Sequence, residues 1–218
     1  MRLVIFDVDG TLVDSQHHIT HAMAAGFAAA DLPPPSREDV LGIVGLSLPV
    51  AVSQLLPLAD LTTQGRVVDG YRAAYLQART QKAAPLYPGA RDCLDRLAAR
   101  DDLLLAVATG KSRRGLDAVI AAHGLDGLFI SLQTADAHPS KPHPSMVHQA
   151  LAEAGAPPER TVMIGDTSFD IDMARAAGVT GFGVAWGYHR REALDAAGAA
   201  LIARDFDDLT RAIEAWAG

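Results

Sequence analysis

The chain contains a single cysteine, Cys93, in 218 residues. One cysteine cannot form an internal disulfide, so the fold must be held by its own core. A chain of this length can bury about 70% of its unfolded surface, which is enough for that purpose. Scarce cysteine is typical of reducing compartments. Because the sequence also enters a predicted strand at once, without the features of a signal peptide, we predict a cytoplasmic location.

Long hydrophobic runs and an excess of positive charge are also missing. The longest apolar run, Leu103 to Ala108, is far shorter than the roughly 20 residues of a membrane-spanning helix. The formal net charge is −7, which disfavours a general nucleic-acid surface. We therefore expect neither a membrane nor a nucleic-acid partner. The oligomeric state stays open between a monomer and a homodimer.

Lysine is scarce as well, since the chain carries only Lys82, Lys111 and Lys141. Any mechanism that uses a lysine therefore has few candidates. Lys111 closely follows a predicted strand, so it could reach a bound anion. It could equally pair with solvent or cap a helix, and the sequence leaves these alternatives open. Lys141 lies in a predicted loop before a helix.

What the chain does contain, at its start, is a short apolar strand followed by two carboxylates. Leu3 to Phe6 are apolar without interruption, which is typical of a strand covered on both faces. Asp7 and Asp9 follow, and Gly10 signals a turn. In an open α/β sheet, ligands bind beyond the carboxyl ends of the strands. The two aspartates are therefore a candidate site, although solvated acids at a strand end would give the same pattern.

Residues 15–82 predict helices and no strand. Apolar side chains recur every four positions from Ile19 onward, and Ser15 is a plausible N-cap before them. Prolines and glycines divide the rest of the block into three further helical runs. The last run carries Tyr71 and Tyr75, which we assign to the core of the block. This organisation predicts a small helix bundle.

Beyond residue 83, predicted strands alternate with helices. This alternation indicates an α/β fold with a doubly wound, mostly parallel sheet and helices on both faces. We expect the α/β core to comprise residues 1–14 and 83–218, and residues 15–82 to form an inserted all-helical cap over the carboxyl edge of the sheet. The expected strands are 3–6, 103–108, 128–132, 161–164, 181–185 and a short one near 201.

Polar side chains follow the ends of the later strands as well. The carboxyl ends of parallel strands meet at one edge of a sheet, so we expect these groups to lie near the two aspartates of the first strand. The set consists of the side chains of Thr109, Lys141, Asp166 and Asp170, together with the backbone N–H of Gly110.

Carboxylates gathered in one place repel each other. At about 4 Å and an effective dielectric near 20, each like-charged pair costs roughly 4 kcal/mol. A hard divalent cation with oxygen ligands offsets this cost, and Mg²⁺ is usually held by one or two carboxylates, water and a substrate phosphate. Histidine and cysteine are absent from these strand ends, which disfavours zinc. Thr109 and the N–H groups of a helix N-terminus suit phosphate oxygens, and a lysine suits the charge of a transferring phosphoryl group.

The segment from Asp7 to Ser15, with the sequence Asp-Val-Asp-Gly-Thr-Leu-Val-Asp-Ser, resembles the first motif of the haloacid dehalogenase-like hydrolase superfamily. Thr109 matches the second motif, Lys141 the third, and Gly165-Asp166 with Asp170 the fourth. The resemblance covers the whole chain and is to the branch with a helical cap after the first strand, above all to phosphoglycolate phosphatases. It implies a Mg²⁺-dependent phosphatase that acts on a small phosphorylated metabolite, with 2-phosphoglycolate as the leading substrate.

The resemblance also implies a role for each matched residue. Asp7 would attack phosphorus and form an aspartyl-phosphate, and Asp9 would act as general acid and then as general base. Lys141 would stabilise the nucleophile and the phosphate. The implied Mg²⁺ ligands are Asp7, the backbone carbonyl of Asp9, and Asp166, with Asp170 as a further ligand or as support for one. The implied substrate-binding residues are Gly10, Thr11, Thr109, Gly110 and Lys141.

Several alternatives stay open. Asp9 favours phosphoryl transfer over haloacid dehalogenation, because a halide leaves without a proton. Mutases of the β-phosphoglucomutase type share all four motifs but carry a histidine near the start of the cap. Ile19 stands at that position here, with His18 one residue away. Inorganic pyrophosphatase activity is another alternative within the family. A non-catalytic binding protein is disfavoured by the complete set of Asp7, Asp9, Lys141 and Asp166.

Overall fold

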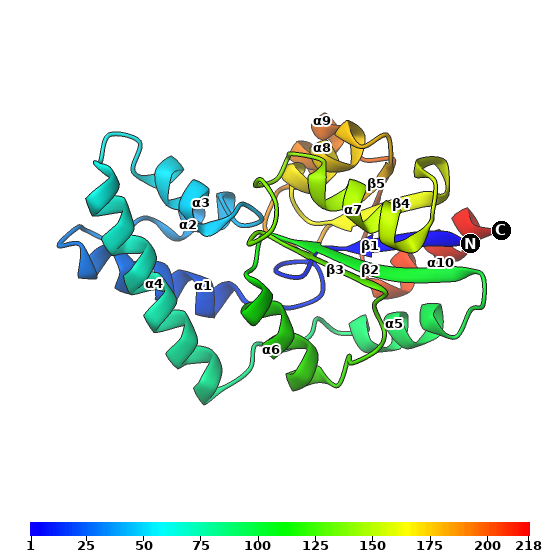
Figure 1. Cartoon of the computed structure of the whole chain (residues 1–218), viewed down its shortest axis with the longest axis horizontal. Helices are drawn as coiled ribbons and strands as arrows, with labels where there is room; N and C mark the ends of the chain where they lie inside the picture. The colour runs from blue at the N-terminus through cyan, green and yellow to red at the C-terminus, as the bar shows by residue number, and fades with distance from the viewer.

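The structure is a computed structural model that describes residues 1–218. Six parallel strands form one sheet in the order β3-β2-β1-β4-β5-β6 (Figure 1). The strands are β1 (Arg2–Phe6), β2 (Leu103–Thr109), β3 (Ser131–Thr134), β4 (Thr161–Gly165), β5 (Thr180–Val184) and β6 (Leu201–Ala203). The helices are α1 (Gln16–Ala29), α2 (Arg37–Gly42), α3 (Leu48–Leu55), α4 (Leu61–Gln81), α5 (Ala90–Ala98), α6 (Arg113–His123), α7 (Ser145–Ala154), α8 (Ser168–Ala176), α9 (Arg191–Ala197) and α10 (Phe206–Ala217), with a short 3₁₀ turn at Pro158–Arg160.

Strand β1 lies in the middle of the sheet and is covered on both faces. Its side chains alternate between two hydrophobic clusters, as the pleat of a strand requires. Val4 and Phe6 pack into the cluster under α5 and α10, whereas Leu3 and Ile5 pack into the one under α7 and α8. Figure 1 shows these helices as layers on opposite sides of the sheet. The predicted doubly wound α/β fold is therefore confirmed.

The third strand differs from the prediction. We expected a strand over 128–132, but β3 spans Ser131–Thr134. Leu128 and Phe129 pack against the hydrophobic core from the preceding loop. Pairing with β2 begins only at Ser131, opposite Ala106. Apolar residues mark what is buried, but the hydrogen-bonded register with the neighbouring strand decides where a strand begins.

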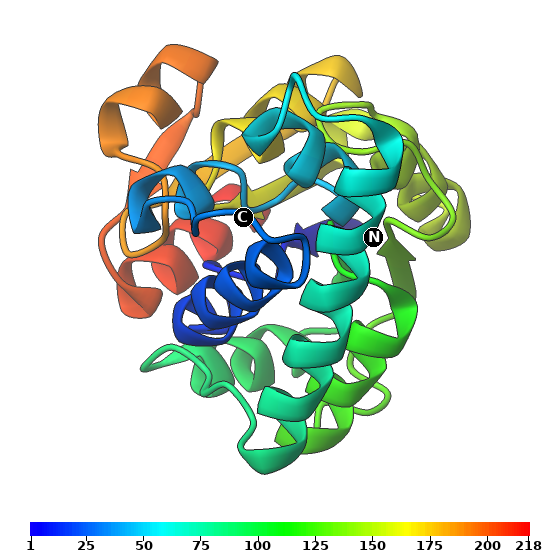
Figure 2. The same ribbon diagram turned by 90° about the vertical axis from the view of Figure 1, so that its left-hand side faces the viewer.

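Helices α1 to α4 lie between β1 and α5 in the chain, and we call them the helical insertion. They share a small hydrophobic core around Met23, Val52 and Val67. Helices α1 and α4 pack closely because they meet at glycines: a Cβ on Gly26 would lie 2.6 Å from the carbonyl oxygen of Val67. Figure 2 views the molecule from the side of the insertion, which covers one edge of the sheet. No helix of the structure has the length and apolar character needed to cross a membrane.

Candidate active site

The site lies where the order of the sheet reverses, between β1 and β4. Phe6, the last residue of β1, is aligned with Val107 of β2 and with Ile164 of β4. From there β2 continues to Thr109 and β4 to Gly165, so all three strands end near this level. The N–H of Asp7 donates to the carbonyl of Ile164 at 2.9 Å, which fixes the start of the loop. Asp166 follows Ile164 by two residues. Such a switch point is where open α/β sheets place their ligands.

Three buried carboxylates meet at this point. Asp7, Asp166 and Asp170 are fully buried, and each offers an oxygen within 4.8 Å of the others. Burial raises the pKa of Asp7 to about 7; Lys141 opposes this rise, while Asp170 and Asp9 add to it. Burial, together with Asp170 and Asp7, also raises the pKa of Asp166 well above its ordinary value. The cluster is therefore short of positive charge.

Lys141 is the one cation inside this cluster. Its Nζ donates to Oδ1 of Asp170 at 2.6 Å and lies 3.0 Å from Oδ1 of Asp7. The second contact lacks the angle of a hydrogen bond, and both oxygens of Asp7 are buried without a hydrogen-bond partner. Burial lowers the pKa of Lys141, but Asp170 and Asp7 outweigh it, so the net shift is upward. The lysine thus remains charged, while Asp7 keeps two unused acceptors.

Asp166 and Asp170 are held in different ways. The Thr11 hydroxyl donates to Oδ1 of Asp166 at 2.8 Å, and the Tyr188 N–H donates to Oδ2 at 2.9 Å. The N–H and hydroxyl of Thr167 both donate to Oδ2 of Asp170, at 3.1 and 2.8 Å, where α8 begins. Thr11, which the resemblance assigns to substrate binding, therefore uses its hydroxyl to orient a carboxylate.

Gly10 leaves the space that Asp166 occupies. Its backbone has φ of +82°, in the region that favours glycine. A Cβ at this position would lie 2.2 Å from Oδ2 of Asp166. Gly187 closes on the same aspartate from the other side, since a Cβ there would lie 2.0 Å from the Asp166 Cβ. Two glycines thus form a tight cradle around one acidic side chain.

Asp9 lies beside this cluster, at the edge of a cavity. Its two carboxylate oxygens each accept a hydrogen bond from Nζ of Lys111 at 2.9 Å. The hydroxyl of Ser15 also donates to Oδ1 of Asp9. Ser15 precedes α1 but makes no side-chain hydrogen bond to the helix. Ser15 is the N-cap residue of α1, as predicted, but its side chain binds Asp9 instead of the helix, because the nearby carboxylate is the stronger acceptor.

Lys111 joins Asp9 to the helical insertion. Its third hydrogen bond runs to the hydroxyl of Tyr75, on α4, at 2.9 Å. Burial lowers the pKa of Lys111, but Asp9 and Tyr75 outweigh it and raise the pKa above its ordinary value. Tyr71 and Tyr75 pack against the core of the insertion, as predicted. Sequence reasoning missed only that Tyr75 is also a site residue. Its four-residue spacing from Tyr71 is the same for a core pair and for a pair that faces a cavity, so no signal in the sequence separates the two.

A cavity of about 670 Å³ lies between the insertion and the sheet. Thr109 and Gly110 line it on the side of the sheet, together with Asp7 and Asp9. Gly110 is covered by the loop of the insertion, since a Cβ there would lie 2.5 Å from the carbonyl oxygen of Gly45. The structure thus brings together at one sheet edge the predicted residues Asp7, Asp9, Thr109, Gly110, Lys141, Asp166 and Asp170, with Gly10 and Thr11 beside Asp166.

These features define an α/β protein with a buried acidic site at the switch point of a parallel sheet. A family model described as haloacid dehalogenase-like hydrolase matches residues 4–184. The chain therefore belongs to this family of enzymes, and the resemblance noted in the sequence is confirmed.

Individual relatives agree with this assignment. The chain is 36% identical to a probable phosphatase, IndB, of Dickeya dadantii, over 98% of this chain and 94% of that protein. It is 30% identical to a phosphoglycolate phosphatase of Haemophilus influenzae, over 86% of this chain and 87% of that protein. The crystal structure of a hydrolase from Pseudomonas syringae superposes with a TM-score of 0.88, at 26% identity and 99% coverage of both chains.

Proposed function

We propose that the protein is a Mg²⁺-dependent phosphatase that hydrolyses a small phosphomonoester through an aspartyl-phosphate. The observation that carries this proposal is Asp7, a buried carboxylate with two unpartnered oxygens, beside Lys141 and at the edge of a cavity. Relatives over most of the chain are named phosphatases. One of those names, phosphoglycolate phosphatase, makes 2-phosphoglycolate the first substrate to test.

The residues fit a magnesium ion. The cluster offers only hard oxygen ligands, and the unpartnered oxygens of Asp7 lack a positive neighbour other than Lys141. Mg²⁺ would be held by Asp7, Asp166 and the backbone carbonyl of Asp9. Asp170 already accepts hydrogen bonds at both oxygens, so its main role would be to position Lys141 and, at most, to share the ion. When bound, the ion would offset the repulsion of the carboxylates and stabilise charge on the phosphoryl group.

The reaction would proceed in two displacements at phosphorus. In the first, a carboxylate oxygen of Asp7 attacks phosphorus while the bond to the leaving alcohol breaks, and Asp9 gives that oxygen a proton. In the second, Asp9 takes a proton from water, whose oxygen attacks phosphorus as the bond to Asp7 breaks. Inorganic phosphate is released and both carboxyl groups return to their starting forms. Lys141, 3.0 Å from Asp7, would balance negative charge in both steps.

The phosphoryl oxygens would be held on the side of the sheet. Thr109 and Gly110 line the cavity there, and the Thr109 hydroxyl and the backbone N–H of Gly110 would be the donors. We assign Thr11 and Gly10 to a different task from direct substrate binding. Thr11 orients Asp166 through the 2.8 Å hydrogen bond from its hydroxyl. Gly10 has no side chain and so leaves the space that Asp166 occupies.

The helical insertion would act as a cap over this core, with residues 15–82 as cap domain and residues 1–14 and 83–218 as catalytic core. A few polar contacts hold the cap closed, among them the Ser47 N–H to the Ser140 hydroxyl at 2.8 Å and Tyr75 to Lys111. Opening would admit substrate, and closure would exclude water from the phosphoryl group.

The mutase alternative has less support, because no histidine reaches the cavity from the start of the cap. Ile19 lines the cavity. His18 is turned away, with Nε2 at 2.9 Å from the backbone carbonyl of Lys82. Release of phosphate rather than an isomerised sugar phosphate is therefore the expected outcome.

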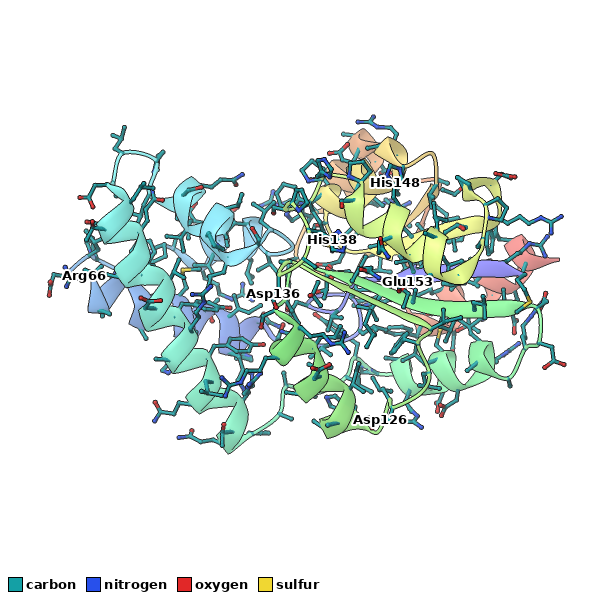
Figure 3. All side chains as sticks on the ribbon, viewed as in Figure 1. Arg66, Asp126, Asp136, His138, His148 and Glu153 are labelled. Carbon is teal, nitrogen blue, oxygen red and sulfur yellow. The ribbon has the colours of Figure 1, made fainter.

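The test is phosphate release from an aryl phosphate with Mg²⁺ present. Asp7→Asn should reduce turnover at least about a thousandfold, since the nucleophile is lost. A chelator should abolish activity, and added Mg²⁺ should restore it. Asp126→Asn is the matched control, because Asp126 is exposed and lies on the far side of α6 from the insertion (Figure 3). Retention of activity by Asp7→Asn would contradict the mechanism.

A further inference from the structure

The cavity is much larger than a two-carbon leaving group requires. Its volume of about 670 Å³ lies within the range of pockets that enclose whole drug-sized ligands. Asp7 and Asp9 are two of the 26 residues that line it. Most of the remaining space would therefore surround the alcohol part of the substrate rather than its phosphoryl group.

The wall on the side of the insertion is apolar. Ile19, Met23, Ile43, Leu48 and Tyr71 all line the cavity from α1, α3, α4 and the segment after α2. Such a wall stabilises apolar surface on a ligand. An ionised group that packs against these apolar side chains, rather than against Arg72 or Arg79 of α4, costs free energy because it is buried without a partner.

The lysine inside the cavity has no donor left for a second anion. The ammonium group of Lys111 has three N–H donors. Two are used by the oxygens of Asp9 and the third by the hydroxyl of Tyr75, all at 2.9 Å. A carboxylate on the leaving group would have to displace one of these partners.

Three arginines line the cavity: Arg72, Arg79 and Arg114. Arg114 is exposed, so water solvates its charge. The Arg72 side chain is 63% exposed and lies 3.6 Å from Asp69. Arg79 donates to the backbone carbonyl of Arg114 at 3.1 Å. On the side of the sheet, Asp136 lines the cavity (labelled in Figure 3), and its carboxylate accepts a hydrogen bond from the Arg113 N–H at 2.6 Å. This distribution of charge favours a neutral leaving group.

Two stacked tyrosines on α4 offer a flat surface to such a group. The rings of Tyr71 and Tyr75 lie 5.6 Å apart with planes inclined by 16°. Both line the cavity, and the Tyr71 hydroxyl makes no hydrogen bond to the protein, unlike that of Tyr75. A ring on the ligand can pack against the aromatic pair, and the free hydroxyl can meet one neutral polar atom.

We propose that the substrate is a phosphomonoester of an uncharged, ring-bearing alcohol rather than of a two-carbon hydroxy acid. This inference rests on the proposed phosphatase function. It adds that the cap selects the leaving group by apolar contact with the wall around Tyr71, and that a second anionic group is disfavoured.

The test compares three esters that all release a primary alcohol: benzyl phosphate, ethyl phosphate and 2-phosphoglycolate. Values of kcat/KM are measured with the full chain and Mg²⁺. Benzyl phosphate should exceed ethyl phosphate by about a hundredfold, since even one methylene in an apolar pocket is worth about tenfold or more. Ethyl phosphate and 2-phosphoglycolate differ by a carboxylate, and the acid should be the poorer substrate or at best equal.

Two variants of Tyr71 test the wall itself. Tyr71→Ala removes the ring and should lower the ratio of benzyl to ethyl phosphate about tenfold. Tyr71→Phe keeps the ring and should retain that ratio. Thermal unfolding reports whether each variant is folded, and if Tyr71→Ala does not fold, the substrate series with the unaltered protein decides.

The outcomes separate the two proposals. The leaving-group proposal is wrong if 2-phosphoglycolate is hydrolysed more efficiently than ethyl phosphate. It is also wrong if kcat/KM for benzyl phosphate exceeds that for ethyl phosphate by less than tenfold. In both cases the phosphatase function stands. An unchanged ratio in folded Tyr71→Ala would also overturn the leaving-group proposal. If none of the three esters nor an aryl phosphate releases phosphate, the phosphatase proposal itself fails, and the leaving-group proposal falls with it.

Discussion

The proposed catalytic role of Asp7 conflicts with the stability of the folded protein. It is completely buried, and neither carboxylate oxygen accepts a hydrogen bond. Asp170 and Asp166 lie close enough to repel it, and Lys141 is the only cation that opposes them. A side chain held in this way is expected to destabilise the folded state, because a buried charge without sufficient partners is costly. Enzymes accept such a cost where the group must react.

Asp7→Asn should therefore stabilise the metal-free protein while it removes activity. The change deletes one negative charge from the cluster and keeps the shape of the side chain. With chelator present, we expect Tm to rise by about 2–4 °C, which corresponds to about 1 kcal/mol in a chain of this size. Differential scanning calorimetry measures the shift. Asp126→Asn, on the surface, serves as the reference, and a fall in Tm for Asp7→Asn would contradict this view of the cluster.

At the scale of elements, α1 and α4 owe their close approach to two glycines. A Cβ on Gly70 would lie 2.8 Å from the Cβ of Ala29 and 2.9 Å from the Cα of Gly26. Gly65, one and a half turns earlier on α4, has no atom within 4 Å of the same position. One helix thus contains a glycine required by packing and a glycine that packing does not require.

Gly70→Ala and Gly65→Ala should change stability in opposite directions. The first forces the two helices apart and should lower the free energy of unfolding by about 1–3 kcal/mol. The second removes the poor helix propensity of glycine and should raise it by about 0.5–1 kcal/mol. Urea unfolding of both variants measures the two changes in the free energy of unfolding. Equal effects would show that the contact between α1 and α4 is not tight.

The segment between β3 and α7 contains His138, which links the two elements. Its ring nitrogens lie 2.8 Å from the Gln133 side-chain oxygen and 2.8 Å from the Ser145 hydroxyl. Burial lowers the pKa of His138; Glu153 opposes this shift and His143 adds to it. The folded protein therefore prefers the neutral imidazole.

His138 should make the protein less stable as the pH falls. The pKa in the folded state lies below the unfolded value near 6.5, so the unfolded state binds the proton more readily. The contribution of His138 to stability is thus fully present above about pH 6.5, and it is lost as the pH falls through the pKa of His138 in the folded state. Urea unfolding measures the free energy of unfolding at pH 7.5 and at pH 5.5. The difference between these two values should be smaller for His138→Gln than for the unaltered protein. Identical differences in the two proteins would rule this contribution out.

At the scale of the whole molecule, few polar bonds join the helical insertion to the rest of the chain near the cavity. Tyr75 to Lys111, at 2.9 Å, is one of them and crosses from α4 to the loop after β2. Arg79 to the Arg114 carbonyl, at 3.1 Å, is another. Weakening a single one of these hydrogen bonds should therefore shift the balance between closed and open arrangements of the helical insertion.

Tyr75→Phe should make the segment after α4 more accessible. Loss of one hydrogen bond to a charged group, about 1 kcal/mol or somewhat more, favours opening by roughly fivefold or more. Limited proteolysis with trypsin, which cleaves after the exposed Lys82, measures the change. Tyr71→Phe is the matched control, because the hydroxyl of Tyr71 makes no hydrogen bond to the protein. Equal cleavage rates in the two variants would show that the Tyr75 contact does not hold the insertion in place.

The sequence by itself determined the class of fold and the location of the site. The apolar run before Asp7 and the later alternation of strands and helices required a parallel sheet. Parallel strands present their carboxyl ends at one edge, so residues as far apart as Asp7, Lys141 and Asp166 could be expected to lie together. The family resemblance could also be seen in the sequence, because each of its motifs is a short local pattern.

Only the tertiary structure decided which side chains pair across that edge. Lys111 had several possible partners, and the fold selects Asp9 and Tyr75. Ser15 is the N-cap residue that its sequence predicts, but its side chain binds a carboxylate rather than the helix. The register of β3 and the apolar wall around Tyr71 were likewise beyond local patterns. The physical reason is that periodicity reports which face of an element is buried, whereas partners and cavities depend on distances between elements that the chain brings together only when it folds.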